Sequence, residues 1–341
     1  MCSGGKRMRG TFSSLILIGL GGCFSMLGRH QPAYAQPNGI RFERITVDQG
    51  LSSNSINSIM QDRLGFIWFG TYDGLHKYDG YQFTVYKPET NNPFSLSHNI
   101  ILSIYEDTDG VFWLGTEGGG LNRFDRETER FTHYRHDPDD PHSLSGDLVS
   151  DIYDDADGVL WVGTQGGGLN RFDRTTERFT HYRHDPDDPH SLSHDIVWTI
   201  YEDRSGVLWI GTLGGGLNRF DGTTGRFTHY RHDPDDPHSL NDNSVRSIHE
   251  DADGVLWIGT EGGGLNRFDR AAERFTHYRY DPDDPHSLSH NSVRSIYEDA
   301  DGVLWLGTHG GGLNRFDRAE ERFTHYRHDP SNRALRTIIV E

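Results

Sequence analysis

Carboxylates and imidazoles recur along the chain in two short patterns that could bind metal ions. A D-x-D-G pattern begins at Asp107 and matches the start of a calcium-binding loop. An apolar run follows it at once, where calcium would need further oxygen ligands, so we predict a hairpin turn. An H-D-P-D-D-P-H pattern places His136 and His142 at the ends of one loop, which could hold zinc or nickel weakly. Nothing visible fixes these imidazoles, so we predict a solvated loop and expect no metal or cofactor.

Catalysis would require an acid, base or nucleophile that stands out from its surroundings. Every prominent carboxylate and histidine instead returns in copy after copy of one repeat, whereas a catalytic set is asymmetric. The triple glycines, such as Gly310–Gly312, precede neither a helix start nor a lysine, so they are turns and not phosphate cradles. Both cysteines, Cys2 and Cys23, lie in the leader, which excludes thiol catalysis and cysteine–zinc sites. The sequence therefore predicts a protein that is not an enzyme.

One repeated segment positions all these residues. The sequence G-V-L-W-I-G-T-E-G-G-G-L-N-R-F-D-R at Gly254–Arg270 recurs nearly unchanged four times and once more loosely. The tryptophans of its W-x-G-T element are spaced by 45 and then by 48 residues, at Trp68, Trp113, Trp161, Trp209, Trp257 and Trp305. A fixed period of this length indicates a repeat architecture.

Each copy contains four short runs of β type. In the last copy, within Asn291–Asp329, these runs are SVRSIYED, GVLWLGT, LNRFD and ERFTHYRHD. Turn signals such as A-D-G and G-G-G separate them, and the prolines of the connector at Asp137–Ser145 cannot continue a ladder. Four antiparallel strands per unit of this length are typical of a β-propeller blade. We predict an all-β propeller in which the six tryptophans wedge between blades and Gly70 and its equivalents allow close backbone approach.

The repeat boundaries predict six complete four-stranded blades over residues 54–328. A signal peptide would occupy residues 1–35, an N-terminal strand and lead-in residues 36–53, and a C-terminal tail residues 329–341. Within these flanks, Arg41–Val47 resembles a fourth strand and Arg336–Val340 a first strand. A seven-bladed ring with an incomplete last blade is therefore the alternative.

Positions where the copies disagree are the candidates for recognition. One column comprises Asn57, Leu102, Ser150, Trp198, Arg246 and Arg294. A second column, 15 residues further on in every unit, comprises Tyr72, Glu117, Gln165, Leu213, Glu261 and His309. The first lies near the start of the innermost strand and the second just after the next strand. Antiparallel pairing places both columns at the same mouth of the central channel, where ligand specificity or simple drift of exposed loops could explain the variation.

The N-terminal leader and the net charge limit where the protein can be located and what it can bind. Basic residues, the apolar run Phe12–Leu27 and Ala33–Ala35 fit a signal peptide cleaved after Ala35, with a lipoprotein site at Cys23 as the alternative. A retained membrane anchor is the third option, although the run is short and interrupted by glycine. The net charge of −18 argues against nucleic acid and anionic membrane surfaces as partners. We predict a periplasmic or extracellular protein.

The repeat also resembles a known family. The motif I-x-x-I-x-x-D-x-x-G-x-x-W-x-G-T-x-x-G-G-L-x-x-F/Y-D, at Ile56–Asp79 and again at Val293–Asp317, is similar to the two-component regulator propeller repeat. The lead-in Phe42–Ile56 resembles the start of the periplasmic sensor domains of hybrid two-component systems. The resemblance implies sensing of small molecules, often glycan fragments, and signalling through a membrane helix to a histidine kinase. Neither helix nor kinase follows Glu341, so we expect a recognition module without its own kinase, or a fragment of a longer gene.

These observations predict an exported, non-enzymatic recognition propeller. Its expected partners are an oligosaccharide or other small molecule, and a membrane-bound histidine kinase or another protein. The alternatives are a protein-binding scaffold and, less favoured, a propeller lyase or hydrolase. Trp198 is the only tryptophan outside the W-x-G-T positions. We expect its ring to stack on a sugar while Arg246, Arg294, Glu261 and Gln165 bind hydroxyls or a uronate carboxylate.

Overall fold

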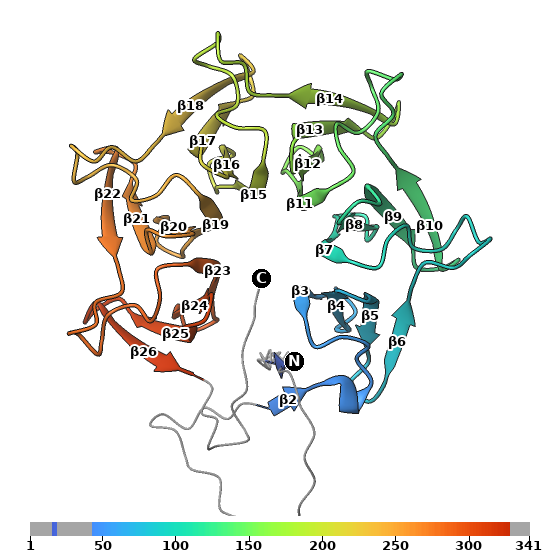
Figure 1. Cartoon of the computed structure of the whole chain (residues 1–341), viewed down its shortest axis with the longest axis horizontal. Coiled ribbons are helices and arrows are strands. Elements are labelled where there is room, and N and C mark those ends of the chain that lie inside the picture. The colour runs from blue at the N-terminus through green and yellow to red at the C-terminus, as the bar shows by residue number, and fades with distance from the viewer. Residues whose placement is uncertain (1–15, 19–42, 328–341) are drawn as a thin grey trace, which may run out of the picture.

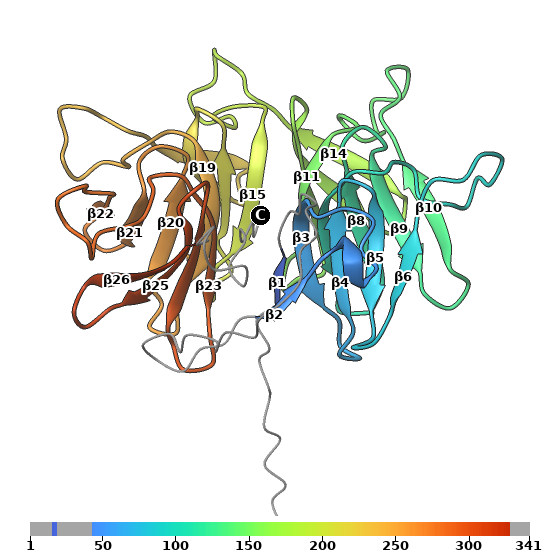
Figure 2. The same cartoon turned by 60° about the horizontal axis from the view of Figure 1, so that its bottom comes forward.

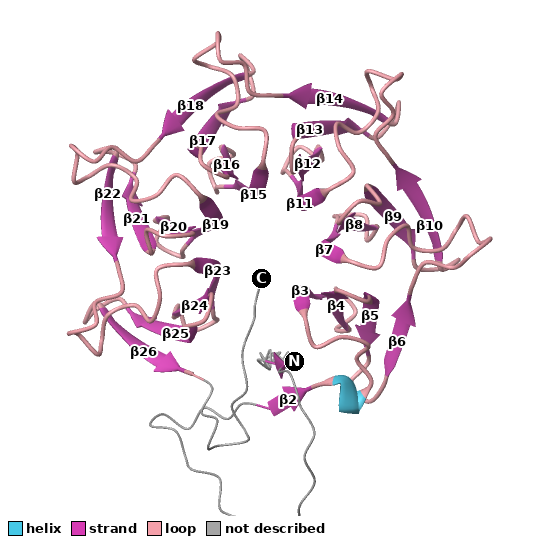
Figure 3. Ribbon diagram, viewed as in Figure 1, coloured by secondary structure: helices cyan, strands magenta, loops and turns pink. Residues whose placement is uncertain are grey.

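The computed structural model describes residues 16–18 and 43–327. Six four-stranded antiparallel sheets stand in a ring and form a six-bladed β-propeller (Figure 1). Figure 3 shows strands joined by loops, with one 3-10 helix among the described residues, η1 (Val47–Gln49), ahead of the first blade. The predicted all-β fold with six complete blades is therefore confirmed. Apart from residues 16–18, the predicted signal peptide lies outside the described residues, as does the predicted tail.

Each blade runs outward from the central axis as four strands in chain order (Figure 1). The inner strands are β3 (Ile56–Gln61), β7 (Ile101–Glu106), β11 (Val149–Asp154), β15 (Val197–Glu202), β19 (Val245–Glu250) and β23 (Val293–Glu298). The second strands are β4 (Ile67–Thr71), β8 (Phe112–Thr116), β12 (Leu160–Thr164), β16 (Leu208–Thr212), β20 (Leu256–Thr260) and β24 (Leu304–Thr308).

The outer half of each blade completes the sheet. The third strands are β5 (Gly74–Tyr78), β9 (Leu121–Asp125), β13 (Gly168–Asp173), β17 (Gly216–Asp221), β21 (Leu265–Asp269) and β25 (Gly312–Asp317). The fourth strands are β6 (Phe83–Tyr86), β10 (Arg130–Tyr134), β14 (Arg178–Tyr182), β18 (Arg226–Tyr230), β22 (Arg274–Tyr278) and β26 (Arg322–Tyr326). We number the blades 1 to 6 in chain order, from β3–β6 to β23–β26.

The apolar core lies between the blades. Every residue of β12, with sequence LWVGT, is buried, because this strand has a neighbouring blade on each face. Trp113 of blade 2 packs against Val149 and Phe172 of blade 3, and the Trp113 and Phe172 rings meet edge to face at 5.6 Å. A Cβ on Gly115 would lie 2.8 Å from a Val149 methyl group, so only glycine permits this approach. The tilted view in Figure 2 shows the inner strands facing one another around the central axis.

The two ends of the ring differ from these junctions. On the first blade, Ile45 of strand β2 (Glu43–Ile45) packs against Leu51, Ile56 and Phe69. On the last blade, the corresponding cluster comprises three buried residues, Trp305, Leu313 and Tyr326. Strand β2 lies between blades 6 and 1 in Figure 1 and pairs in parallel with β1 (Ile16–Ile18), within the predicted leader. Within the predicted strand at 41–47, residues 43–45 form β2, which among the described residues pairs with β1 and not with a blade strand.

Candidate functional site

Both variable columns lie at the same end of the blades. In every blade, the backbone N–H of the second-column residue donates a hydrogen bond to the carbonyl two residues before its first-column partner. For example, Gln165 N–H donates to Leu148, two residues before Ser150, and Glu261 N–H donates to Ser244, two residues before Arg246. One mouth of the ring therefore carries all twelve positions.

The first-column residues occupy a β-bulge in each inner strand. The pairing of β11 with β12 skips from Val149 to Asp151, which leaves Ser150 without a cross-strand partner. The other five inner strands skip at the equivalent residue, so the first column consists of the bulge residues. A bulge releases its side chain from the regular packing of the strand and aims it differently. This explains why residues as different as Asn57, Leu102 and Trp198 fit the same position.

A cavity of about 150 Å³ lies among these bulge residues. All six first-column side chains line it, together with Gln165 of the second column. Glu261 joins them through ion pairs to Arg246 and Arg294. The remaining second-column residues do not line the cavity: Tyr72, Glu117 and His309 are exposed on the rim, and Leu213 is partly buried. The structure thus gathers part of the predicted set into one pocket.

A chain of four side chains dominates one side of this pocket. The Arg246 guanidinium lies 3.4 Å from the centre of the Trp198 ring. Its Nε donates to Glu261 Oε2 at 2.7 Å, and Arg294 Nη2 donates to Glu261 Oε1 at 3.1 Å. The Arg246 guanidinium therefore covers one face of Trp198, the side chain that the sequence predicts to stack on a sugar. Two guanidinium groups share one carboxylate on this side of the pocket.

The two metal-like patterns serve the backbone. In the D-x-D-G turn, Asp107 Oδ1 accepts from the backbone N–H groups of Asp109 and Val111, and Oδ2 accepts from Trp113 Nε1 at 2.9 Å. The aspartate therefore ties a hairpin turn to the inter-blade tryptophan. In the connector, His136 Nδ1 lies 2.9 Å from the Leu144 carbonyl oxygen. Within residues 43–327, no three His, Cys, Asp or Glu side chains gather closely enough to hold a metal ion.

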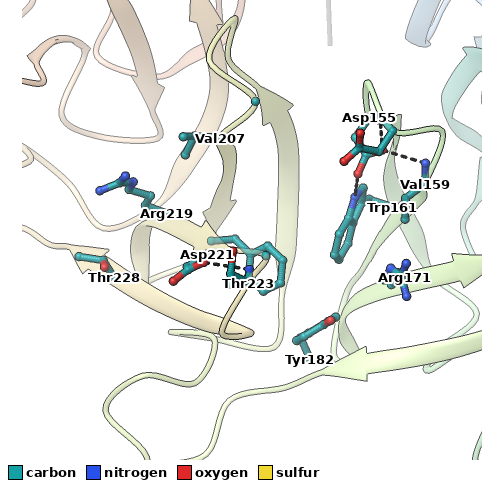
Figure 4. Close-up of a pocket in the computed structure, with 14 residues that line it drawn as sticks. Asp155, Val159, Trp161, Arg171, Tyr182, Val207, Arg219, Asp221, Thr223 and Thr228 are labelled. Carbon is teal, nitrogen blue, oxygen red and sulfur yellow. Dashed lines mark hydrogen bonds between the residues drawn. The ribbon is translucent and has the colours of Figure 1, made fainter.

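A second, larger cavity of about 810 Å³ opens between blades 3 and 4 (Figure 4). Its lining includes Asp155, Trp161 and Tyr182 of blade 3, and Gly222 and Asp221 of blade 4. None of the residues in the two variable columns lines it. The available signal was in the segment D-G-T-T-G at 221–225, which breaks the D-R-x-x-E pattern of blades 2, 3, 5 and 6.

Comparison with known proteins identifies the repeat. A family model for the two-component regulator propeller matches residues 50–73, 95–118, 143–166, 191–214, 239–262 and 287–310. The crystal structure of an extracellular domain, described as part of a hybrid two-component system from B. thetaiotaomicron, is 32% identical with a TM-score of 0.64. That match covers 80% of this chain and 41% of the other, so this chain spans less than half the length of its relative.

Two further matches are more limited. A histidine kinase, P4, from Formosa agariphila is 40% identical over 63 residues, which is 18% of this chain and 5% of the kinase. A virginiamycin B lyase from Staphylococcus aureus, with 16% identity, a TM-score of 0.59 and coverage of 80% and 84%, shares the fold alone. No helix among the described residues is both long and apolar enough to cross a membrane. The chain is thus a six-bladed β-propeller built from two-component regulator propeller repeats.

Proposed function

We propose that this chain is an exported recognition propeller that binds an anionic sugar at the mouth ringed by the bulge residues. The observation that carries the proposal is the chain Trp198–Arg246–Glu261–Arg294, in which two guanidinium groups share one carboxylate beside an aromatic ring. The resemblance to extracellular domains of hybrid two-component systems supports a role in sensing.

Charge favours an acidic ligand over a neutral one. The Arg246 and Arg294 side chains are 24% and 16% exposed, so water screens them only in part. A carboxylate entering the pocket would accept forked, charge-assisted hydrogen bonds from these groups.

Size limits how much of the ligand the pocket can enclose. Pockets for drug-sized molecules usually span about 300–1,000 Å³, whereas this one is about 150 Å³. It therefore takes the acidic end of one sugar unit, and the rest of an oligosaccharide would lie across the rim near Tyr72, Glu117 and His309. The part of the Trp198 ring that lines the cavity and is not covered by Arg246 would contribute aromatic contact with the sugar.

The test is a titration with oligosaccharides of hexuronates and with neutral oligosaccharides of equal length, followed by tryptophan fluorescence. We expect saturable binding of the acidic series only. Trp198→Ala should weaken binding by about 1–3 kcal/mol with little change in melting temperature. Arg294→Gln should weaken it too, while Arg274→Gln, which changes an exposed arginine on β22, should have no effect.

Trp209→Ala provides the opposite control, because Trp209 is buried between blades 4 and 5. It should lower stability by roughly 3–5 kcal/mol and leave the affinity of the folded protein unchanged. If no acidic sugar perturbs the wild type, or if Trp198→Ala melts as early as Trp209→Ala, the mouth is not the binding site.

A further inference from the structure

An arginine crosses four of the five junctions between consecutive blades. It follows the third strand of the later blade and forms ion pairs with two carboxylates. In the junction of blades 2 and 3, Arg174 Nη1 lies 2.6 Å from Asp107 Oδ2, and Nη2 lies 2.7 Å from Asp154 Oδ1. The turn aspartate of the earlier blade is joined in this way to the acid that ends the inner strand of the later blade by Arg126, Arg174, Arg270 and Arg318. Three of them use both terminal nitrogens, and Arg270 uses Nη2 for both contacts.

Blade 4 lacks this arginine. Gly222 occupies its position, and Gly225 stands where blades 2, 3, 5 and 6 have a glutamate. In those blades the glutamate forms a hydrogen bond with the preceding blade. For example, Glu177 accepts a 3.0 Å hydrogen bond from the Tyr134 hydroxyl. Two side chains are therefore missing from one junction, and the 810 Å³ cavity lies where they would be, with Tyr182 and Gly222 in its lining (Figure 4).

The carboxylates that the arginine would bind are still present. Asp155 Oδ2 accepts a hydrogen bond from Trp161 Nε1 at 2.7 Å, and Glu202 Oε2 accepts one from the Ala156 N–H at 2.8 Å. Neither carboxylate forms an ion pair with any of the described residues. Asp155 is partly exposed, whereas Asp107, with its arginine in place, is buried. Burial, together with the nearby charges of Asp155, Asp157 and Asp203, raises the pKa of Glu202.

We propose that the cavity between blades 3 and 4 is a binding site for a guanidinium group, which takes the place that an internal arginine holds in the other four junctions. The ligand would present its planar cation to Asp155 and Glu202 through two N–H donors, as Arg174 does to Asp107 and Asp154. Its stem would extend outward past Gly222.

The sibling junctions favour a guanidinium over other cations. Each places one planar guanidinium between two separate carboxylates, and three of the four use both terminal nitrogens, a geometry that an ammonium group does not match. Arg174 also lies over the Trp113 ring at 5.7 Å, and Trp161 is the equivalent ring in the cavity. A metal ion would need a third ligand, and no such group of side chains is present in residues 43–327.

The outer wall limits the charge of the ligand. Arg171 and Arg219 line the cavity as well, opposite in charge to Asp155, Asp157 and Asp221. Neither arginine forms an ion pair with these carboxylates among the described residues. Asp155 lines the cavity, and Glu202 borders it at Gly206, where a Cβ would lie 3.8 Å from Glu202 Oε1. These two carboxylates would attract the cation, and the balance of charges suits a single positive charge.

The experiment follows the indole N–H signals of the ¹⁵N-labelled protein while Nα-acetyl-arginine amide is added at constant ionic strength. The Trp161 signal, assigned with Trp161→Phe, should shift saturably, because its N–H donates to Asp155. The Trp113 signal should stay in place, since Arg174 fills that junction. Methylguanidinium should act at the same signal, and a weaker response to it would show that the cavity also contacts the stem. Nα-acetyl-lysine amide should bind at least tenfold more weakly.

Substitutions at Gly222 separate the effect of an internal guanidinium group from the effect of a side chain that only takes up space. Gly222→Arg should abolish the shift, since it supplies the guanidinium internally, and a Cβ at this residue meets only a Phe220 ring atom, at 3.9 Å. Gly222→Ala adds the Cβ without charge and should retain binding. Arg174→Gly should open the equivalent cavity and make the Trp113 signal respond to the ligand.

Three results would overturn the proposal: no shift at Trp161, an equal response to the lysine derivative, or unchanged binding in Gly222→Arg. Because Gly222→Ala and Gly222→Arg alter an exposed turn residue, loss of folding is not expected to obscure the result. The outcome is independent of sugar binding at the mouth, which involves none of these residues.

Discussion

The junction of blades 2 and 3 and the junction of blades 3 and 4 have nearly the same apolar core but different polar links. In the first, Trp113 meets Phe172 at 5.6 Å, and in the second Trp161 meets Phe220 at 5.3 Å. Arg174 and Glu177 bridge the first junction, whereas glycines replace both residues in the second. The blades nevertheless pack in the same way in both places.

This difference separates two roles that the repeat usually combines. Burial of the tryptophan and its apolar partners holds neighbouring blades together, while the arginine and glutamate close the outer edge of the junction. A junction can therefore lose its polar links and keep its geometry, and the space left behind becomes available to a ligand. Substitutions at the two junctions can test this separation.

Replacing either tryptophan should be severe. Trp113→Ala and Trp161→Ala should each lower the free energy of unfolding by roughly 3–5 kcal/mol, because each leaves a large cavity in an apolar cluster. Urea denaturation followed by circular dichroism measures both. If the apolar core holds both junctions, the two losses will agree to within about 1 kcal/mol. A mild effect at Trp161 alone would show that the junction of blades 3 and 4 depends on other contacts.

Removing the bridging arginine should cost less. Arg174→Gly leaves the Asp107 and Asp154 carboxylates buried without their cation, which should lower stability by about 1–3 kcal/mol, since the arginine is itself 30% exposed. Gly222→Arg should raise stability by a smaller amount. Thermal unfolding of both variants beside Arg171→Gln, an exposed arginine, provides the comparison. If Arg174→Gly is as stable as the wild type, the polar links contribute even less to stability than proposed.

The inner ends of the two junctions should respond differently to pH. Burial raises the pKa of Asp151 to about 7, although its carboxylate accepts hydrogen bonds from the backbone N–H groups of Ile152 and Ile200. A carboxyl with a raised pKa stabilises the fold fully below its unfolded pKa, and this contribution is lost as the pH rises through about 7. Blade 2 has Ser103 at the equivalent position.

Asp151→Ser should therefore be more stable than the wild type at pH 8 by about 1–2 kcal/mol, with the advantage shrinking or vanishing at pH 5. Unfolding curves at the two pH values, subtracted between variants, isolate this residue from the other titrating groups. A stability difference that does not change with pH would exclude the titration of Asp151 as the cause.

The smallest effect concerns the tyrosines. Burial and the hydrogen bond to Glu177 raise the pKa of Tyr134 to about 12, so its hydroxyl remains a donor at ordinary pH. Tyr134→Phe should lower stability by about 0.5–1 kcal/mol, whereas Tyr182→Phe should have no measurable effect, because Gly225 offers no acceptor. Equal losses in differential scanning calorimetry would contradict the proposed difference between the junctions.

The fold was predictable because its main determinants are local and repeated. The spacing of Trp68 and its equivalents, the turn signals and the alternation of apolar residues predicted the strands and the blade count. The columns of Ser150 and Gln165 were placed at one mouth from antiparallel pairing alone. Their chemistry was not predictable in detail, since the guanidinium of Arg246 covers Trp198 across neighbouring blades.

The larger cavity depended on contacts that the sequence does not display. Arg174 pairs with Asp107, 67 residues earlier in the chain, and nothing in the intervening residues marks them as partners. The substitution of Gly222 for arginine therefore looked like an ordinary change in an exposed turn. The difference is visible only in three dimensions, where the sibling arginines bridge their junctions and Gly222 does not.

The paired glycines at 222 and 225 also have a genetic consequence. Every arginine codon and every glutamate codon lies one base change from a glycine codon, so each replacement needs only a single point mutation. Recombination between this unit and any of its near-identical neighbours would restore both side chains in a single event. A cavity formed by replacing two side chains with glycine can thus arise easily in one copy of a tandem repeat, and it can be lost as easily. The persistence of Gly222 together with Gly225 in natural variants of this gene would accordingly measure selection on the cavity.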